Sequence, residues 1–186
     1  MRLFVALDIS REIREPIAKL IRELKPLDDS WKWTSAKNLH VTLKFLGETP
    51  GEKLEMVKES LRGVSSEFPI LLKFKSLGFF PNERRPRVLW VGLEAPTSLG
   101  KLAHSIDESL GNIGVPREDR EFSPHLTLAR NRKGALSPQL RDAIAHHSGQ
   151  FFGEMTAKSF HLIESRLKST GAEYTTLESY SGSQKS

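Results

Sequence analysis

His40-Val41-Thr42-Leu43 and His125-Leu126-Thr127-Leu128 are two copies of one pattern, and each lies in an apolar run that predicts a β-strand. Side chains alternate between the two faces of a strand, so each histidine is expected on the same face as the threonine two residues later. The apolar residues of the pattern face the opposite side and can hold the strand against a core. Each copy therefore offers an imidazole and a hydroxyl group from one rigid surface.

The elements predicted around the two copies indicate a long internal repeat. The copies are 85 residues apart, about half of the 186-residue chain, and each follows a strand and a helix and precedes another helix. A repeat of this length predicts two pseudo-symmetric lobes with the motif strands facing each other across a central cleft, and not a solenoid. Helices are expected over residues 11–24, 50–62, 98–112 and 138–147, and strands over residues 3–9, 31–34, 39–46, 70–80, 88–93, 121–130, 155–167 and 173–180.

We therefore expect a single α+β domain over residues 1–186, built from these two lobes. The last residues, 181–186, are small and polar and are expected to form a disordered tail.

Composition places the chain among ordinary globular proteins, with 38% hydrophobic and 27% charged residues. No apolar run approaches the length of about 20 residues that a membrane-spanning helix needs. The first apolar run is ended by Asp8 and is too short for a signal peptide, so we expect a cytoplasmic monomer without membrane contact. The net charge of +5 and the pI near 9.5 favour an anionic partner. A basic surface without a specific partner explains the charge equally well.

Several classes of chemistry lack the residues that they need. The chain has no cysteine, which excludes disulfides, thiolate nucleophiles and cysteine-ligated zinc or iron–sulfur sites. Neither motif histidine has an acidic neighbour at the spacing of a known metal signature, so no metal site is expected. A Gly-x-Ser-x-Gly elbow and a glycine-rich phosphate loop are also missing from the sequence. General acid–base catalysis by the two imidazoles remains.

Two histidines in one cleft suit acid–base catalysis at phosphorus. An unperturbed histidine has a pKa of about 6.5, so one ring can accept a proton at neutral pH while the other, beside an anion, donates one. In an in-line displacement, one ring deprotonates the attacking water and the other protonates the departing oxygen. The hydroxyl groups of Thr42 and Thr127 could donate hydrogen bonds to the non-bridging oxygens, although threonine is also common in strands for its shape alone. A strained cyclic phosphodiester could be opened in this way without a metal ion.

Three stretches of the sequence resemble one protein family. They are LHVTLKFLGE (residues 39–48), RPRVLWVG (residues 85–92) and PHLTLAR (residues 124–130), and the likeness extends from Phe4 to Tyr174. Together with the paired motifs they resemble the 2H phosphoesterase superfamily, and within it most closely the bacterial and archaeal RNA 2′,3′-cyclic phosphodiesterases, also called 2′-5′ RNA ligases. One such motif would be weak evidence, whereas two in matching contexts are specific.

The resemblance implies a bilobal α+β fold in which two antiparallel β-sheets form a pseudo-twofold arrangement, with helices on the outside and both motifs in a central cleft. It also implies hydrolysis of the 2′,3′-cyclic phosphate of an RNA end or of a cyclic nucleotide to a 2′-phosphate, with no metal ion or cofactor. In the family pattern His40 is the proton donor to the 3′ oxygen and His125 is the acceptor that activates water. The residues themselves do not favour this assignment over its reverse.

Two further residues near the motifs are candidates for substrate contact. Arg130 could bind a phosphate, but strict alternation places it opposite His125, so it reaches the cleft only if the strand ends or bulges near Ala129. Lys44 has the same parity as His40, but a lysine at a strand edge is usually only solvated, so it is the weaker candidate.

A basic loop lies between two predicted strands. Its arginines, Arg84, Arg85 and Arg87, could follow an RNA backbone, and Phe79 or Phe80 could stack on a base. A solvated loop over a core aromatic residue is the alternative.

Three alternative functions stay open. The same chemistry with an RNA 5′-hydroxyl in place of water joins RNA ends through a 2′-5′ bond without ATP. A phosphodiesterase for a small cyclic nucleotide, such as ADP-ribose cyclic phosphate, would use the same groups. A non-catalytic RNA- or nucleotide-binding module would need neither histidine, and the retention of both argues against it.

Overall fold

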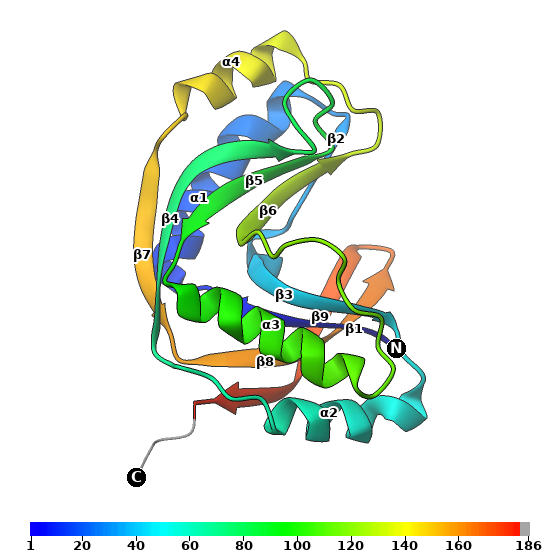
Figure 1. Cartoon of the computed structure of the whole chain (residues 1–186). Helices are drawn as coiled ribbons and strands as arrows, with labels where there is room; N and C mark the ends of the chain where they lie inside the picture. Colours follow the sequence, from blue (N-terminus) through cyan, green and yellow to red (C-terminus); the bar gives the residue numbers. More distant parts are fainter. Residues whose placement is uncertain (183–186) are drawn as a thin grey trace.

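The computed structural model describes residues 1–182 as two antiparallel β-sheets that face each other, with α-helices on their outer sides (Figure 1). Sheet A has the strand order β3 (His40–Glu48), β1 (Arg2–Asp8), β8 (Ser159–Lys168) and β9 (Gly171–Ser181). Sheet B has the order β2 (Trp31–Trp33), β6 (His125–Asn131), β5 (Val88–Glu94), β4 (Ile70–Phe80) and β7 (Phe151–Ala157). The bilobal α+β fold class predicted from the sequence is confirmed.

Helices cover both sheets from outside. The α-helices are α1 (Arg11–Leu24), α2 (Leu54–Arg62), α3 (Thr97–Gly111) and α4 (Pro138–His146), and the short 3-10 helices are η1 (Lys25–Leu27), η2 (Ala36–Asn38) and η3 (Gly51–Lys53). None of the helices within residues 1–182 is both long and apolar enough to cross a membrane.

Each lobe takes elements from both halves of the chain. Sheet A is completed by β8 and β9 from the end of the sequence, and sheet B receives β2 and β4 from the first half. Helix α1 follows β1 but packs on β7 and α4 beside sheet B, whereas α2 and α3 pack on each other and on β9 and β3 of sheet A (Figure 1). The lobes are therefore tied together by crossing segments, and their boundary is not the midpoint of the sequence.

The motif strands sort their side chains as the alternation predicts. Val41, Leu126 and Leu128 are fully buried and Leu43 almost so, while the histidines and threonines of both motifs are half-buried. These apolar side chains belong to one hydrophobic cluster that runs through both lobes. Burial of the apolar face therefore holds each motif strand in place, because a shift of one residue would move this face into the cleft.

Three predicted segments differ in the structure. Residues 155–167 were predicted as one strand and form parts of two: β7 pairs with β4 in sheet B, β8 pairs with β1 in sheet A, and only Lys158 separates them. Residues 121–124 belong to a loop, so β6 begins at His125. In the predicted tail, Ser181 ends β9 in register with Ser159, and residues 183–186 lie outside the described residues.

A buried ion pair links β3 to the loop of residues 112–124, which connects α3 to β6. The Nζ atom of Lys44 lies 2.6 Å from Oδ1 of Asp107 on α3, and the lysine side chain is only 4% exposed. Lys44 also donates to the carbonyl oxygen of Pro116 at 2.7 Å, and Asp107 accepts from the backbone N–H of Glu118 at 3.0 Å. Although desolvation opposes it, these hydrogen bonds to Asp107 keep the pKa of its carboxyl group below the ordinary value.

Removing the lysine from this pair should destabilise the fold. We expect Lys44→Met to lower the free energy of unfolding by about 3 kcal/mol, because it leaves the largely buried Asp107 carboxylate, which is 17% exposed, without its partner. The double variant Lys44→Met/Asp107→Leu should recover part of this loss, since it removes the unpaired charge. Chemical denaturation followed by circular dichroism measures both changes.

The control for this prediction is Lys53→Met, because Lys53 is an exposed lysine in η3. Its effect should stay within about 0.5 kcal/mol. A loss in Lys44→Met no larger than that of the control would show that the ion pair does not support the fold.

Candidate active site

Two backbone carbonyls orient the motif histidines in the same way. Nδ1 of His40 lies 2.7 Å from the carbonyl oxygen of Asn38, and Nδ1 of His125 lies 2.8 Å from that of Ser123. A carbonyl oxygen can only accept a hydrogen bond, so each Nδ1 must carry the proton. Nε2 is therefore the nitrogen that takes up or releases a proton in both rings.

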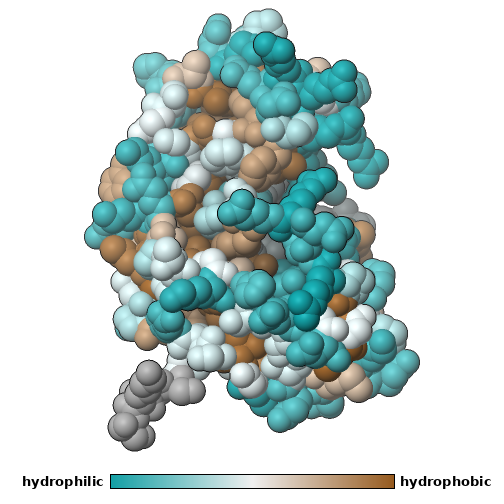
Figure 2. All heavy atoms as spheres, viewed as in Figure 1, coloured by the Kyte–Doolittle hydropathy of each residue, from teal (hydrophilic) through white to brown (hydrophobic). Residues whose placement is uncertain are grey.

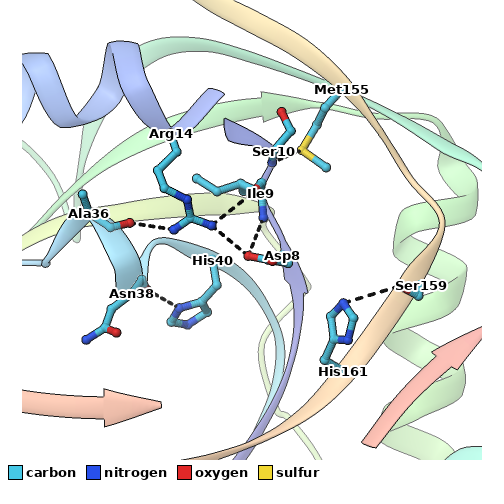
Figure 3. Close-up of polar contacts among 10 residues, drawn as sticks. All are labelled: Asp8, Ile9, Ser10, Arg14, Ala36, Asn38, His40, Met155, Ser159 and His161. Atoms are coloured by element: carbon cyan, nitrogen blue, oxygen red, sulfur yellow. Dashed lines mark hydrogen bonds and ion pairs between the residues drawn. The ribbon is translucent and has the colours of Figure 1, made fainter. Parts of the chain in front are cut away.

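The Asn38 carbonyl is held from two sides. The side-chain amide of Asn38 donates to the carbonyl oxygen of Ala172 in β9 at 2.7 Å. At the other end of the η2 turn, Arg14 of α1 donates to the carbonyl oxygen of Ala36 at 2.6 Å and to Oδ1 of Asp8 at 2.9 Å (Figure 3). The acceptor for His40 is thus fixed by contacts to α1 and β9.

The Ser123 carbonyl belongs to the loop of residues 112–124. This loop has no helix or strand of its own, but the Lys44–Asp107 pair holds it at Pro116 and Glu118. The strand that carries His40 therefore also anchors the loop that orients His125.

Each motif strand carries an extra residue directly after its threonine. In β3, Thr42 and Lys44 pair with consecutive residues of β1, so Leu43 is a β-bulge. Leu128 bulges in β6 in the same way against β5. An extra residue reverses the alternation of the side chains that follow it until the next bulge, which in β3 comes at Leu46, so the residues directly after each bulge change faces.

The bulges decide which neighbours of the motifs reach the cleft. Arg130 could reach the cleft only if its strand ended or bulged near Ala129. The bulge at Leu128 meets this condition and turns Arg130 to the cleft face. Its contact with a phosphate stays a prediction. Lys44 lies at the wall of the cleft beside α3, where its charge is taken up by the ion pair with Asp107, so it is not on the same face as His40 and Thr42. Phe45 faces the cleft instead and is 55% exposed. Sequence reasoning missed Phe45, although it holds the position of Arg130 in the first copy of the repeat.

The cleft has two arms that meet at the histidines. Thr42, Phe45, His125 and Arg130 line both arms. The apolar arm, a cavity of about 1000 Å³, lies beside α3 and is also lined by Phe80, Pro81, Val88 and Phe122. The basic arm, about 1080 Å³, contains His40 and Thr127 and reaches η2 and the β8–β9 hairpin. On the face drawn in Figure 2, hydrophobic side chains come to the surface between α3 and sheet B.

Aromatic rings pack against both histidines. The ring centroid of His40 lies 4.7 Å from that of Phe4 and 5.3 Å from that of Tyr174. The His125 ring meets Phe80 edge to face at 4.8 Å. These rings shield the imidazoles from water on one side, which disfavours their charged forms.

Both histidines have pKa values below the ordinary value. Burial is the largest cause for each, and the positive charge of Arg130 lowers both pKa values further. The bonds to the carbonyl oxygens oppose the shift, and the Asp8 carboxylate also opposes it at His40. Both rings are therefore neutral in the free protein at neutral pH, and an anion bound between them would favour protonation of one.

Of the other residues proposed from the sequence, some line the cleft and others do not. Arg87 lines the apolar arm, whereas neither Arg84 nor Arg85 lines either of the two arms. Phe80 lies in the apolar arm against His125, while Phe79 packs on Trp31. In the described part of the chain, no group of three or more histidine, cysteine or acidic side chains is placed to hold a metal ion.

Both halves of the chain match one family model, LigT like Phosphoesterase, over residues 7–90 and 91–174. The chain is 38% identical over 177 residues to the RNA 2′,3′-cyclic phosphodiesterase of Archaeoglobus fulgidus, which covers 95% of this chain and 98% of that protein. It is 39% identical over 180 residues to the protein of the same name from Methanocaldococcus jannaschii, and this match covers 97% of this chain and 100% of that protein. The repeated match supports the long internal repeat seen in the two motifs.

Two solved structures share the architecture over nearly their whole length. TT0787 of Thermus thermophilus superimposes with a TM-score of 0.81 at 32% identity and covers 99% of this chain and 100% of its own. Escherichia coli LigT complexed with 3′-AMP superimposes with a TM-score of 0.79 at 28% identity and covers 98% of each chain.

The charge of Arg130 should contribute to the lowered pKa values of both histidines. We expect Arg130→Gln to raise the pKa of His40 and of His125, because it removes a positive charge that lowers both. An NMR titration of the imidazole Cε1–H signals measures the two shifts. Arg132→Gln, which removes the same charge from an exposed position just beyond the end of β6, is the matched control and should leave both pKa values in place. Equal shifts in the two variants would contradict a local effect of Arg130.

Proposed function

We propose that this chain, which belongs to the LigT like phosphoesterase family, hydrolyses the 2′,3′-cyclic phosphate ends of RNA to 2′-phosphomonoesters. One observation carries the proposal: the two motif histidines share a cleft and are oriented by equivalent bonds to backbone carbonyls. The relatives from A. fulgidus and M. jannaschii are named for activity on such cyclic phosphates, and the match spans nearly the whole chain.

The reaction needs one proton acceptor and one proton donor. Water attacks the phosphorus atom opposite the 3′ oxygen, and Nε2 of one histidine takes its proton. The bond between phosphorus and the 3′ oxygen breaks, and Nε2 of the other histidine protonates that oxygen. The product carries a 2′-phosphate and a 3′-hydroxyl group, and no metal ion or cofactor takes part.

We assign His40 as the proton donor and His125 as the acceptor. Asp8 supports this assignment, because its carboxylate raises the pKa of His40 and so favours a protonated ring there, whereas Arg130 lowers the pKa of both rings and no carboxylate of residues 1–182 raises that of His125. The electrostatic difference agrees with the roles that the family pattern implies.

The threonines and the arginine hold the phosphate. The hydroxyl groups of Thr42 and Thr127, one step along each motif strand, donate hydrogen bonds to the non-bridging oxygens, where charge must be stabilised in the transition state. Arg130 pairs with the same oxygens. The bound anion offsets the charge of Arg130 on the imidazoles, so protonation of the donor is coupled to substrate binding.

The central test follows uridine 2′,3′-cyclic phosphate in the presence of EDTA and identifies the monophosphate formed. We expect the 2′-phosphate, and a loss of about a hundredfold or more in kcat/KM for His40→Ala and for His125→Ala. His146→Ala, at an exposed position on α4, is the control and should retain activity. A 3′-phosphate product, inhibition by EDTA, or full activity in either variant of the motif histidines would overturn the mechanism.

The pH dependence tests the assignment of donor and acceptor. The kcat/KM profile should be bell-shaped with both limbs below pH 6.5, because both histidines of the free protein have lowered pKa values. A general acid must be protonated, so residual activity in His40→Ala should lose the basic limb. A general base must be neutral, so His125→Ala should lose the acidic limb. The opposite pattern would reverse the assignment.

A further inference from the structure

The two arms of the cleft differ in charge. Besides Arg130, the basic arm is lined by four cationic side chains and one carboxylate, which are Arg2, Lys32, Lys37, Lys168 and Glu173. The carboxylate is paired with the lysine of the β8–β9 hairpin. This leaves a surplus of positive charge on one side of the histidine pair.

Two lysines of the basic arm are available to an anion. Lys32 on β2 and Lys37 on η2 are both exposed, and neither forms an ion pair with a carboxylate among residues 1–182. Lys37 directly precedes Asn38, whose carbonyl orients His40. These two lysines therefore line a path that begins beside the proposed proton donor.

The apolar arm has no comparable surplus. Its lysine, Lys44, is taken up by the buried pair with Asp107. Apart from Arg130, its arginines are Arg87 and Arg120, and the carboxylates of Glu118 and Glu121 line the same arm. An anionic chain would meet a nearly balanced set of charges there and a hydrophobic surface.

We propose that the RNA substrate lies across the histidines in one direction, with the nucleotides 5′ to the cyclic phosphate in the basic arm along Lys37 and Lys32. The proposal rests on the proposed function for the position of the cyclic phosphate. A single strand carries one negative charge per nucleotide, and lysines that neutralise phosphates release bound counterions and gain affinity. A cyclic mononucleotide has no further phosphate to place there, so the enzyme prefers an oligonucleotide end.

The experiment compares a uridylate hexamer that ends in a 2′,3′-cyclic phosphate with uridine 2′,3′-cyclic phosphate. The measured quantity is the ratio of the two kcat/KM values, which should exceed one in the wild-type protein. Lys32→Gln/Lys37→Gln should lower this ratio by about tenfold, since an exposed ion pair contributes up to about fivefold. The plot of log kcat/KM for the hexamer against log salt should become shallower by about 1.4, or about 0.7 for each lost phosphate contact.

Two control variants distinguish a specific effect of Lys32 and Lys37 on this ratio from a general effect of net charge and from binding of the RNA in the opposite direction. Lys19→Gln/Lys53→Gln removes the same charge at exposed positions on α1 and η3 and should leave the ratio unchanged. Arg120→Gln lies in the apolar arm and should also leave it unchanged. A ratio that falls in Arg120→Gln and not in the variant of Lys32 and Lys37 would reverse the direction of the RNA and overturn the proposal.

The outcomes for the two proposals are distinguishable. Turnover of the mononucleotide that depends on both motif histidines supports the proposed function, whatever happens to the ratio. If neither substrate is turned over, binding of a fluorescently labelled hexauridylate, measured by anisotropy, still tests the basic arm. Unchanged affinity and salt dependence in Lys32→Gln/Lys37→Gln would then overturn the inference.

Discussion

The hydrogen bond from Nδ1 of each motif histidine to a carbonyl two residues earlier is the interaction on which the cleft depends. It sets which nitrogen of the ring exchanges protons, and it holds rings whose pKa values are lowered by burial among aromatic side chains. Both carbonyls lie outside the strands, in η2 and in the loop of residues 112–124. Each therefore needs its own support, which comes from the Asn38 amide for His40 and from the Lys44–Asp107 pair on β3 and α3 for His125.

The motif strands of the two lobes have equivalent backbone geometry, but they place different side chains in the cleft. The bulges at Leu43 and Leu128 occur at equivalent positions and turn the second residue after each bulge toward the cleft. That residue is Phe45 in one lobe and Arg130 in the other. A symmetric pair of histidines thus lies in an asymmetric cleft, with a basic arm on one side and an apolar arm on the other. This asymmetry gives a substrate one preferred direction across a nearly twofold site.

The predictions failed where a strand leaves one sheet for the other. Residues 155–167 contain no glycine or proline, so local patterning gives no reason to divide them. The division at Lys158 arises because β7 completes sheet B and β8 pairs with β1 in sheet A. The sequence pattern also could not predict that α1 packs beside sheet B although it follows a strand of sheet A. An amphipathic pattern shows that a helix has a buried face, but it does not show which sheet covers that face.

The sequence by itself determined the α+β class and the face on which each motif histidine and threonine lies, because these follow from short-range periodicity and from burial of Val41 and Leu126. It also determined the long repeat, which follows from the duplicated motif and from the matching order of elements around each copy. The alternation of side chains also indicated that Arg130 could reach the cleft only if its strand ended or bulged near Ala129. Only the tertiary structure decided that the bulges exist and that Lys44 is buried while Phe45 faces the cleft. The register of a strand and its bulges depends on the neighbour with which it pairs, and that neighbour is distant in the chain.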